Sequence, residues 1–415
     1  MTRAEQPLPR QGPRPLPLHL SAALTTWTTS AAAWPLWKNG WLPSNPQAAE
    51  AADRLKAELA EADPDAFNAA LQRTLIQRQR ELLDGIQAYR HHPYRRDVAD
   101  PPAIWRDGTT RLLDYGAVPG GPGPDAPVVL AVPSLINRAY ILDLKADTSL
   151  LRWLAASGLR PLLVDWDAPG EAERGFDLTA YIAGRLDGAF EAARAAAGTQ
   201  PVAVLGYCMG GLLALALAQR RPRDVSALAL LATPWDFQAT NPGQARLAAQ
   251  AGSALAPLMR AVGQLPTDVV QSFFAGLDPM TAARKFTAFA RMADGERVER
   301  FVAVEDWLND GVPLAGPVAR ECLHDWYGAN APVRGAWRVA GRPVDPAGVR
   351  CPAFAMVPQA DRIVPPESTR ALTHRLPRVQ VEAPKLGHIG MVTSSRAART
   401  AWPPLVTWLR TTLAA

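Results

Sequence analysis

The chain has 415 residues, of which 48% are hydrophobic and 20% charged, and its formal net charge is +5 at pH 7. This length is enough for one large domain or two smaller ones, and the composition is that of an ordinary globular protein. Lysine and arginine are scattered and form no block of like charges, which argues against nucleic acid as a partner.

Three cysteines, Cys208, Cys322 and Cys351, are too few and too widely spaced for a disulfide scaffold. Such sparse cysteine usage is typical of a reducing cytoplasm. The six histidines show no metal-ligand spacing, so we expect no metal site. The N-terminus is broken by prolines and lacks the apolar run of a secretory signal. We therefore expect a cytoplasmic protein.

Residues 1–100 predict a disordered tip followed by a helical extension. Residues 1 to about 20 are rich in proline and arginine, which is typical of disorder. The next segment, to about residue 45, contains Trp27, Trp34, Trp37 and Trp41. These indoles either pack on the rest of the protein or form an apolar surface for a partner or particle. Residues 46–90 have the periodicity of one or two amphipathic helices.

From residue 101 onward, apolar strand patterns alternate with helix patterns. The predicted strands are 109–118, 127–135, 160–167, 201–207, 225–237, 351–366 and 379–392, and the predicted helices are 148–158, 177–198, 208–218 and 401–413. This alternation indicates an α/β fold with a mostly parallel sheet covered by helices on both faces.

Between about residues 238 and 340 the pattern is helical, and the strand pattern then returns. A helical insertion at this place forms a cap over the carboxyl edge of the sheet, where open α/β sheets bind ligands. We therefore expect residues 101–415 to form one catalytic domain with a helical cap at about 238–340.

The stretch "PVAVLGYCMGGLLALALA", residues 201–218, is long enough to cross a bilayer. Its order argues otherwise, because β-branched residues lead into a glycine-flanked turn and then into a run with high helix propensity. We expect a buried strand, a tight turn and a buried helix, and hence no transmembrane segment.

Cys208 lies at this turn, as the reactive residue of a nucleophile elbow would. Gly206 and Gly210 have the small size that the close approach of strand and helix requires. The helix N-terminus favours a thiolate at Cys208. The alternative is a buried structural cysteine, which is common for this residue type.

In this fold the nucleophile is followed along the chain by an acid and then a histidine. His388 comes just after the last predicted strand, whereas His374 falls in a helix and His324 in the cap. Asp361 follows a strand, where its carboxylate can orient the imidazole; alternatively it caps the next helix. The predicted catalytic residues are therefore Cys208, Asp361 and His388, with an α/β-hydrolase fold.

The predicted oxyanion hole combines the backbone N–H of Met209 with one from the loop after strand 127–135, for which we choose Ile136. Asn137, Arg138 and Tyr140 lie beside it and either shape the pocket or order a turn.

Six blocks of the sequence resemble, in order, those of polyhydroxyalkanoate synthases. They are "SLINRAYILDL", "LLVDWDAPG", "GYCMGG", "LATPWDF", "QADRIVPPEST" and "LGHIGMVTSSRA". The resemblance covers roughly Trp105 to the C-terminus and is greater to the short catalytic chain of two-subunit synthases than to single-subunit ones. The set of six carries the resemblance, since Gly-x-Cys-x-Gly alone also occurs in dienelactone-type hydrolases.

The resemblance implies an acyltransferase. Cys208 would take a 3-hydroxyacyl group from coenzyme A as a thioester, with His388 as general base, and Asp361 would orient His388 or help activate the incoming 3-hydroxyl group. It implies acyl-CoA as substrate with no cofactor, and a growing polyester chain as acceptor. A homodimer or a second synthase subunit, and polymer granules, are the partners it suggests.

The chain departs from the family pattern at several places. Arg362 stands where these synthases usually have histidine, and Asp167 stands where they commonly have glycine. The cap matches only in its later part. Two alternatives therefore stay open: a cysteine hydrolase acting on hydroxyalkanoate esters or acyl thioesters, and a non-catalytic granule protein.

Overall fold

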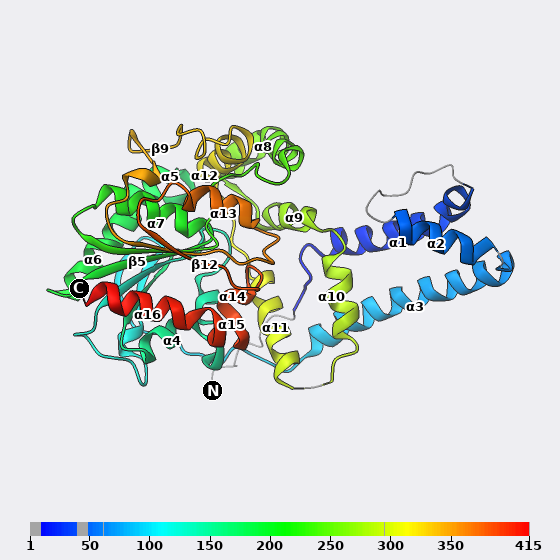
Figure 1. Ribbon diagram of the computed structural model, residues 1–415, viewed down its shortest axis with the longest axis horizontal. Coiled ribbons are helices and arrows are strands. Elements are labelled where there is room, and N and C mark those ends of the chain that lie inside the picture. Colours follow the sequence, from blue (N-terminus) through cyan, green and yellow to red (C-terminus); the bar gives the residue numbers. More distant parts are fainter. Residues whose placement is uncertain (1–9, 40–48, 61, 294, 415) are drawn as a thin grey trace. The chain divides into compact units, whose positions relative to one another are not determined.

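The computed structural model describes residues 10–39, 49–60, 62–293 and 295–414 (Figure 1). Its chain divides into two compact units. Unit 1 combines the residues up to Tyr94 with Phe274–Asn309, and unit 2 combines Arg95–Phe273 with Asp310–Ala415. The segment 274–309, from the middle of the predicted cap, thus belongs with the N-terminal helices, while the cap itself stays a prediction.

Among the described residues of unit 2, eight strands form one sheet in the order β1-β2-β4-β3-β5-β6-β11-β12. The strands are β1 (Ala103–Asp107), β2 (Thr110–Asp114), β3 (Val128–Val132), β4 (Arg160–Asp165), β5 (Val202–Tyr207), β6 (Val225–Leu231), β11 (Ala353–Met356) and β12 (Val379–Glu382). Only β2 pairs antiparallel with its neighbours, β1 and β4; the other pairings are parallel. The predicted mostly parallel sheet is confirmed.

The central strands are buried along their whole length because helices cover both faces. The covering elements include α4 (Leu150–Ala156), α6 (Asp187–Ala197), α7 (Met209–Arg220), α13 (Pro366–Thr373), α14 (Gly390–Thr393), α15 (Ser395–Thr400) and α16 (Trp402–Leu413). In Figure 1, α4 and α16 lie on one side of the sheet and α7 on the other. α7 is apolar all round and its residues Met209–Ala218 are buried, which is the environment predicted for this stretch.

The predicted helix 177–198 is present but changes its geometry along its length. It begins as α5 (Leu178–Ala180), continues as the π-helical η6 (Tyr181–Leu186) and ends as α6. A second π-helix, η7 (Glu321–Gly328), follows α12 (Gly316–Arg320). π-Helical turns are rare and occur frequently at functional sites.

The cap-region residues of unit 2 are partly helical. They contain α8 (Pro242–Val262), the first part of α9 (Thr267–Leu277), α12 and η7, with short strands β7 (Gln264–Leu265), β8 (Leu314–Ala315), β9 (Arg338–Val339) and β10 (Arg342–Pro343). Gln238 joins this region to the segment after β6, because its side-chain amide donates to the carbonyls of Tyr327 and Gly328 at 3.0 and 2.9 Å.

Unit 1 is helical. Its elements are α1 (Leu16–Lys38), α2 (Ala49–Ala60), α3 (Pro64–His91), α10 (Thr281–Phe289) and α11 (Glu296–Asn309), with the last residues of α9. A buried cluster joins α1, α3, α10 and α11; its members include Ala23, Leu82, Ile86, Tyr89, Phe286, Phe289 and Val302. α3 and α10 approach so closely that a Cβ on Gly85 would lie 2.0 Å from the Phe286 carbonyl oxygen.

Residues 10–20 correct the prediction of disorder over the first 20 residues. α1 begins at Leu16, and the Arg10 guanidinium pairs with Asp306, its Nε lying 2.6 Å from Oδ1. The Tyr89 hydroxyl donates to the same carboxylate oxygen at 2.9 Å. These contacts join segments distant in sequence, so composition alone did not reveal them. Residues 1–9 lie outside the described part of the chain.

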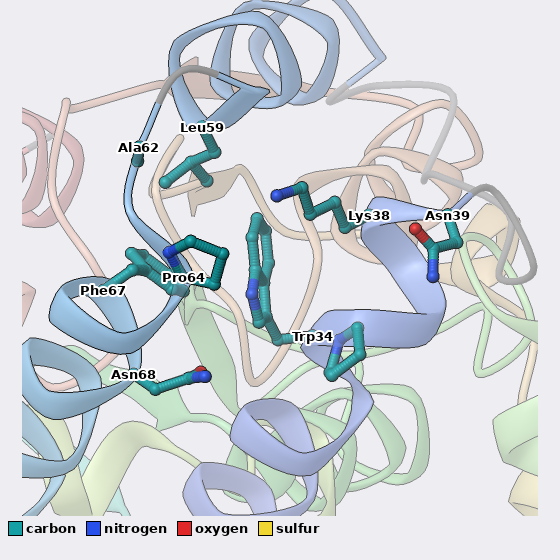
Figure 2. A pocket seen from close by; sticks show the side chains of 9 residues that line it. Trp34, Lys38, Asn39, Leu59, Ala62, Pro64, Phe67 and Asn68 are labelled. Atoms are coloured by element: carbon teal, nitrogen blue, oxygen red, sulfur yellow. The ribbon is translucent and has the colours of Figure 1, made fainter.

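The tryptophans of α1 face other helices of unit 1. Trp27 packs against the buried cluster, and the Trp34 ring lies 4.7 Å from that of Phe67 on α3. Figure 2 shows Trp34, Phe67 and Leu59 around a cavity of about 220 Å³. These contacts favour the packed alternative for these indoles, while Trp41 lies outside the described residues.

Candidate active site

Cys208 occupies the single residue between β5 and α7. Its backbone has φ 56° and ψ −129°, a conformation that few non-glycine residues adopt. The Cys208 N–H donates to the Leu231 carbonyl at 2.9 Å, and its own carbonyl accepts from Gly211 at the same distance. The side chain is partly exposed. Strand, strained residue and helix N-terminus are the local geometry of a nucleophile elbow.

The glycines around Cys208 allow backbone segments to approach closely. A Cβ on Gly206 would lie 2.4 Å from the Gly211 Cα, and one on Gly210 would lie 2.1 Å from the Val132 carbonyl oxygen. Real Cβ atoms do not approach backbone atoms so closely, so no larger residue fits without moving the strand or the helix. Gly210 also fixes how near the loop after β3 comes to the elbow.

His388 and Asp361 lie together beside this elbow. The Asp361 Oδ2 atom is 2.6 Å from His388 Nδ1, and both side chains are buried. Cys208 lies near enough to His388 that its negative charge raises the pKa of the imidazole. The three residues predicted from the sequence therefore lie close together, although Cys208 is far from Asp361 and His388 in the sequence.

The second carboxylate oxygen of Asp361 is fully engaged. Oδ1 accepts from the backbone N–H groups of Ile363 and Val364 at 2.8 and 2.9 Å. α13 begins only at Pro366, so Asp361 closes a turn before the helix and does not cap it. With both oxygens occupied, the carboxylate is positioned to orient His388.

Opposing effects act on the pKa of His388. Burial lowers the pKa, while the negative charge of Cys208, hydrogen bonds with Asp361 and Cys208, and the charge of Asp361 raise it. The raising effects dominate and bring the pKa of His388 to about 10. An imidazole held in this way can take a proton from a nucleophile and later give it to a leaving group.

The two predicted oxyanion donors differ in their surroundings. Met209 is the first residue of α7, where a backbone N–H has no acceptor within the helix. The N–H of Ile136 donates to the Ser134 hydroxyl at 3.0 Å. Ile136 lies in the loop after β3, whose first residue, Pro133, approaches Gly210 closely. Its role in an oxyanion hole stays a prediction.

Two tyrosines that sequence reasoning did not select border the site. The Tyr207 hydroxyl donates to the His388 carbonyl at 3.2 Å, and the two rings lie 5.1 Å apart. Tyr327, on η7, is near enough to Cys208 that its pKa is raised first by burial and then by the negative charge of Cys208. Tyr207 could have been recognised from its place next to Cys208, and Tyr327 only from the fold.

The other cysteines are poor nucleophiles. Burial raises the pKa of Cys351 to about 11 and raises the pKa of Cys322 still further. His324 is exposed and pairs with Asp325 at 2.8 Å, and His374 ends α13. Neither stands in the arrangement that Cys208 and His388 share.

Among the residues that the structure describes, no three or more His, Cys, Asp or Glu side chains gather as a metal site would require. Within the described part of the chain, no helix is both long enough and apolar enough to cross a membrane.

Residues 127–394 match the sequence model of a family described as the alpha/beta hydrolase fold. The match runs from just before β3 to α14 and contains Cys208, Asp361 and His388. It covers well over half of the chain.

The chain is also similar to several poly(3-hydroxyalkanoate) polymerase subunits. The proteins of Allochromatium vinosum and Synechocystis sp. are each 28% identical to it, over 75% and 79% of this chain and 88% of their own length. That of Haloferax mediterranei is 28% identical over 74% of this chain, and the alignment spans 62% of its length.

Proposed function

This chain belongs to the alpha/beta hydrolase fold family, and on that premise we propose that it is an acyltransferase of the polyhydroxyalkanoate synthase type. It transfers 3-hydroxyacyl groups from coenzyme A, through a thioester on Cys208, to a growing polyester. The observation that carries the proposal is a cysteine at the elbow, beside the hydrogen-bonded pair of His388 and Asp361, in a chain similar over three quarters of its length to polymerase subunits.

The first step is acylation of Cys208. The thiolate attacks the carbonyl carbon of the acyl-CoA, the oxyanion is stabilised by backbone N–H groups, and the bond to the coenzyme A sulfur breaks. His388 gives its proton to the departing thiolate, so free coenzyme A is released. Asp361 holds Nδ1 of the imidazole, which leaves Nε2 to face Cys208.

The second step transfers the acyl group to an alcohol. The 3-hydroxyl oxygen attacks the Cys208 thioester, His388 takes the hydroxyl proton, and the carbon–sulfur bond breaks as the new ester bond forms. The Cys208 thiolate and the His388 imidazolium are then restored. Water in place of the alcohol would give a free hydroxy acid, so polymer growth requires that water be excluded from the thioester.

We also propose that the protein acts in the cytoplasm at the surface of polymer granules, as a homodimer or with a second synthase subunit. The apolar character of α1 supports the granule, since Leu18, Leu24 and Leu36 are exposed on it. Exposed apolar side chains are what contact with an apolar polymer surface would require.

The test is incubation of the purified protein with 3-hydroxybutyryl-CoA, following thiol release and the acyl product together. We expect thiol release with insoluble polyester, and no release by the Cys208→Ala variant. Thiol release with free 3-hydroxybutyrate would contradict the synthase assignment and indicate a hydrolase of the same fold. Release by Cys208→Ala at the normal rate would refute catalysis by Cys208.

A further inference from the structure

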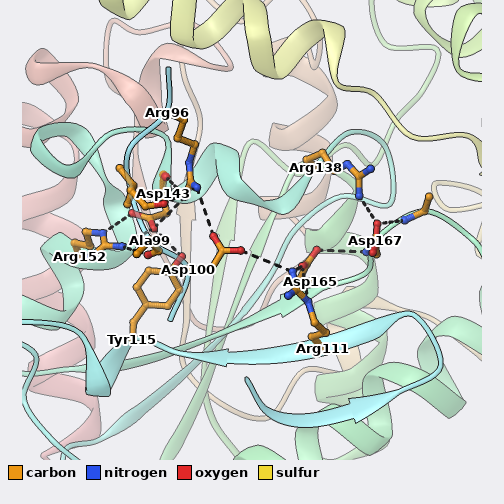
Figure 3. Close-up of polar contacts among 12 residues, drawn as sticks. Arg96, Ala99, Asp100, Arg111, Tyr115, Arg138, Asp143, Arg152, Asp165 and Asp167 are labelled. Atoms are coloured by element: carbon orange, nitrogen blue, oxygen red, sulfur yellow. Dashed lines mark hydrogen bonds and ion pairs between the residues drawn. The ribbon is translucent and has the colours of Figure 1, made fainter. Parts of the chain in front are cut away.

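Asp167 adopts a left-handed backbone conformation, which is uncommon outside glycine, asparagine and aspartate. It follows β4 by two residues and has φ 57°, in the left-handed region. Its Oδ1 atom accepts from the Ala168 N–H at 2.7 Å and pairs with the Arg138 guanidinium (Figure 3). Glycine would adopt this backbone without strain.

Stability does not explain an aspartate at this position. The Asp167 and Arg138 side chains are 46% and 31% exposed, and ion pairs with this exposure contribute little to folding. The strain of a non-glycine residue at positive φ acts against folding. Asp310 is a second and more distant partner of the Arg138 guanidinium, at 3.5 Å, so Asp167 makes the shorter of its two carboxylate contacts.

Arg138 ends the loop of residues 133–138, which follows β3 and contains Ile136. The other end of this loop is also held by the segment after β4, because the buried Trp166 Nε1–H donates to the Pro133 carbonyl at 3.1 Å. Between these two points, the Asn137 Oδ1 atom accepts from the Gln271 side-chain amide at 3.0 Å. Neighbouring side chains thus form hydrogen bonds with the loop on both sides of Ile136.

The Asp167 end of this connection is itself fixed to the sheet. The Asp167 N–H donates to Asp165 Oδ1 at 3.3 Å, and Asp165 Oδ2 accepts from Arg111 Nε on β2 at 3.1 Å. Figure 3 shows this succession from Arg111 through Asp165 and Asp167 to Arg138. The loop also abuts the elbow, since a Cβ on Gly210 would lie 2.6 Å from the Pro133 carbonyl.

We propose that Asp167 is a positioning residue for acyl transfer, which holds the loop 133–138 in place through Arg138 and so sets the geometry of the thioester carbonyl at Cys208. The inference rests on the proposed function, because acyl transfer is the reaction that this loop would serve. Small displacements of groups that surround a reacting carbonyl lower the rate strongly.

The experiment compares Asp167→Asn, Asp167→Gly and Arg138→Gln with the wild type. Asp345→Asn is the matched control: Asp345 is also 46% exposed, bonds a backbone N–H, and pairs with Arg375 at 2.8 Å, but lies on the far segment before β11. Single-turnover acylation by 3-hydroxybutyryl-CoA or p-nitrophenyl acetate measures carbonyl chemistry. Alkylation of Cys208 by iodoacetamide measures the thiolate alone.

We expect acylation to fall by about 10- to 100-fold in all three variants, while alkylation stays within about twofold of the wild type. Hydrogen exchange should become faster in peptides covering 133–138 and stay unchanged in α7. The Asp167→Asn/Arg138→Gln double variant should be no slower than Arg138→Gln alone, because Arg138→Gln already removes the contact with Asp167 together with the one with Asp310.

Acylation at the wild-type rate in Asp167→Asn, or unchanged hydrogen exchange over 133–138, would overturn the proposal. An equal loss of alkylation and acylation would overturn it as well, because the thiolate itself would then be affected. If the wild type fails to acylate, the proposed function fails, and the hydrogen-exchange comparison still decides whether Asp167 holds the loop.

Discussion

Cys208 combines a reactive side chain with a strained backbone conformation. This conformation does not stabilise the folded protein. Its positive φ throws the thiol clear of the sheet at the start of α7, beside His388. Strain of this kind is kept in proteins at sites that require it for function. The two other cysteines lie in ordinary backbone and differ from Cys208 in their surroundings.

We predict that Cys208→Ser and Cys208→Ala lower the rate of acyl-enzyme formation at least ~10³-fold. Cys322→Ala and Cys351→Ala should stay close to the wild type, because burial suppresses both thiolates. Rapid quench with labelled acyl-CoA measures the acyl-enzyme directly. If the Cys208→Ala variant still became labelled, another residue would have to be the nucleophile.

Glu321 is a titrating residue away from the catalytic residues. It begins the π-helix η7, and its Oε2 atom accepts from the Leu178 N–H at the start of α5 at 3.2 Å. Burial is the main cause that raises the pKa of Glu321 to about 7, and the charges of Asp177 and Asp325 add to it. The carboxyl group therefore changes its charge near neutral pH.

This raised pKa sets the sign of a pH effect on stability. The folded state keeps the Glu321 proton up to about pH 7, whereas the unfolded chain loses it near 4.5, so unfolding becomes easier as the pH rises between these values. We predict that Glu321→Gln raises the free energy of unfolding by on the order of 2 kcal/mol at pH 8 and has little effect near pH 4.5.

Urea unfolding of both proteins at the two pH values measures this difference. Glu367→Gln, at a half-exposed glutamate of α13, is the control and should change stability little at either pH. A Glu321→Gln variant that is equally stable or less stable than the wild type at pH 8 would contradict the assignment.

At the scale of elements, the junction of β5 and α7 depends on close backbone contact. Gly206 and Gly210 leave room for Gly211 and for the carbonyl of Val132, and both approaches fall below the distances that a Cβ tolerates. Gly184, in η6, has no atom within 4 Å of where its Cβ would be. A glycine-to-alanine substitution therefore introduces a steric clash at Gly210 and none at Gly184.

We predict that Gly210→Ala destabilises the protein by about 1–3 kcal/mol, because the Cβ would force α7 away from β3. Gly184→Ala should change stability little. Thermal unfolding measures both, and the position of Cys208 can be followed by its alkylation rate. A Gly210→Ala variant with wild-type stability would mean that α7 shifts without penalty.

Much of the element pattern could be predicted because buried parallel strands and amphipathic helices carry strong periodic signals. β3, β5 and α7 are examples, since they are apolar throughout and bounded by turn residues. β1 was missed because Ala103–Asp107 is an edge strand with mostly exposed residues and no clear alternation. The π-helical turns in η6 and η7 arise from backbone hydrogen bonding, for which side-chain periodicity gives no signal.

The part of the candidate site that could be predicted is the part that lies in recognisable sequence motifs. Cys208, Asp361 and His388 each lie in a short block with a defined place in the fold, and their proximity follows from the order of the strands. The bond between Trp166 and Pro133, and the pairing of Arg138 with Asp167, join two loops whose contact no local pattern encodes. For that reason the sequence alone did not decide whether Arg138 shapes the pocket or orders a turn.

At the scale of the whole molecule, the chain divides its residues between the units in an interleaved way. Unit 1 takes residues up to Tyr94 and the separate segment Phe274–Asn309, and its buried cluster draws on both. Phe286 lies at the centre of this cluster, fully buried, with its ring 5.6 Å from that of Tyr89 and 5.5 Å from that of Phe301.

We predict that Phe286→Ala destabilises unit 1 by about 3–5 kcal/mol, because it leaves a cavity between α3 and α10. Hydrogen exchange should become faster in α3 and α11 and stay unchanged in β5 and α7. Ile76→Ala, at a residue of α3 that is 58% exposed, is the control and should have little effect. Equal loss of protection in both units would show that they unfold together.

The interleaved chain order has a consequence for synthesis on the ribosome. When α1 and α3 have emerged, α10 and α11 have not been translated, so the apolar faces that will meet Phe286 and Val302 lack their final partners. Translation of the strands up to β6 and of α8 separates the two halves of this core. Domains usually fold from the N-terminus as they emerge, but here α1 and α3 belong to a unit that is completed only after much of the sheet.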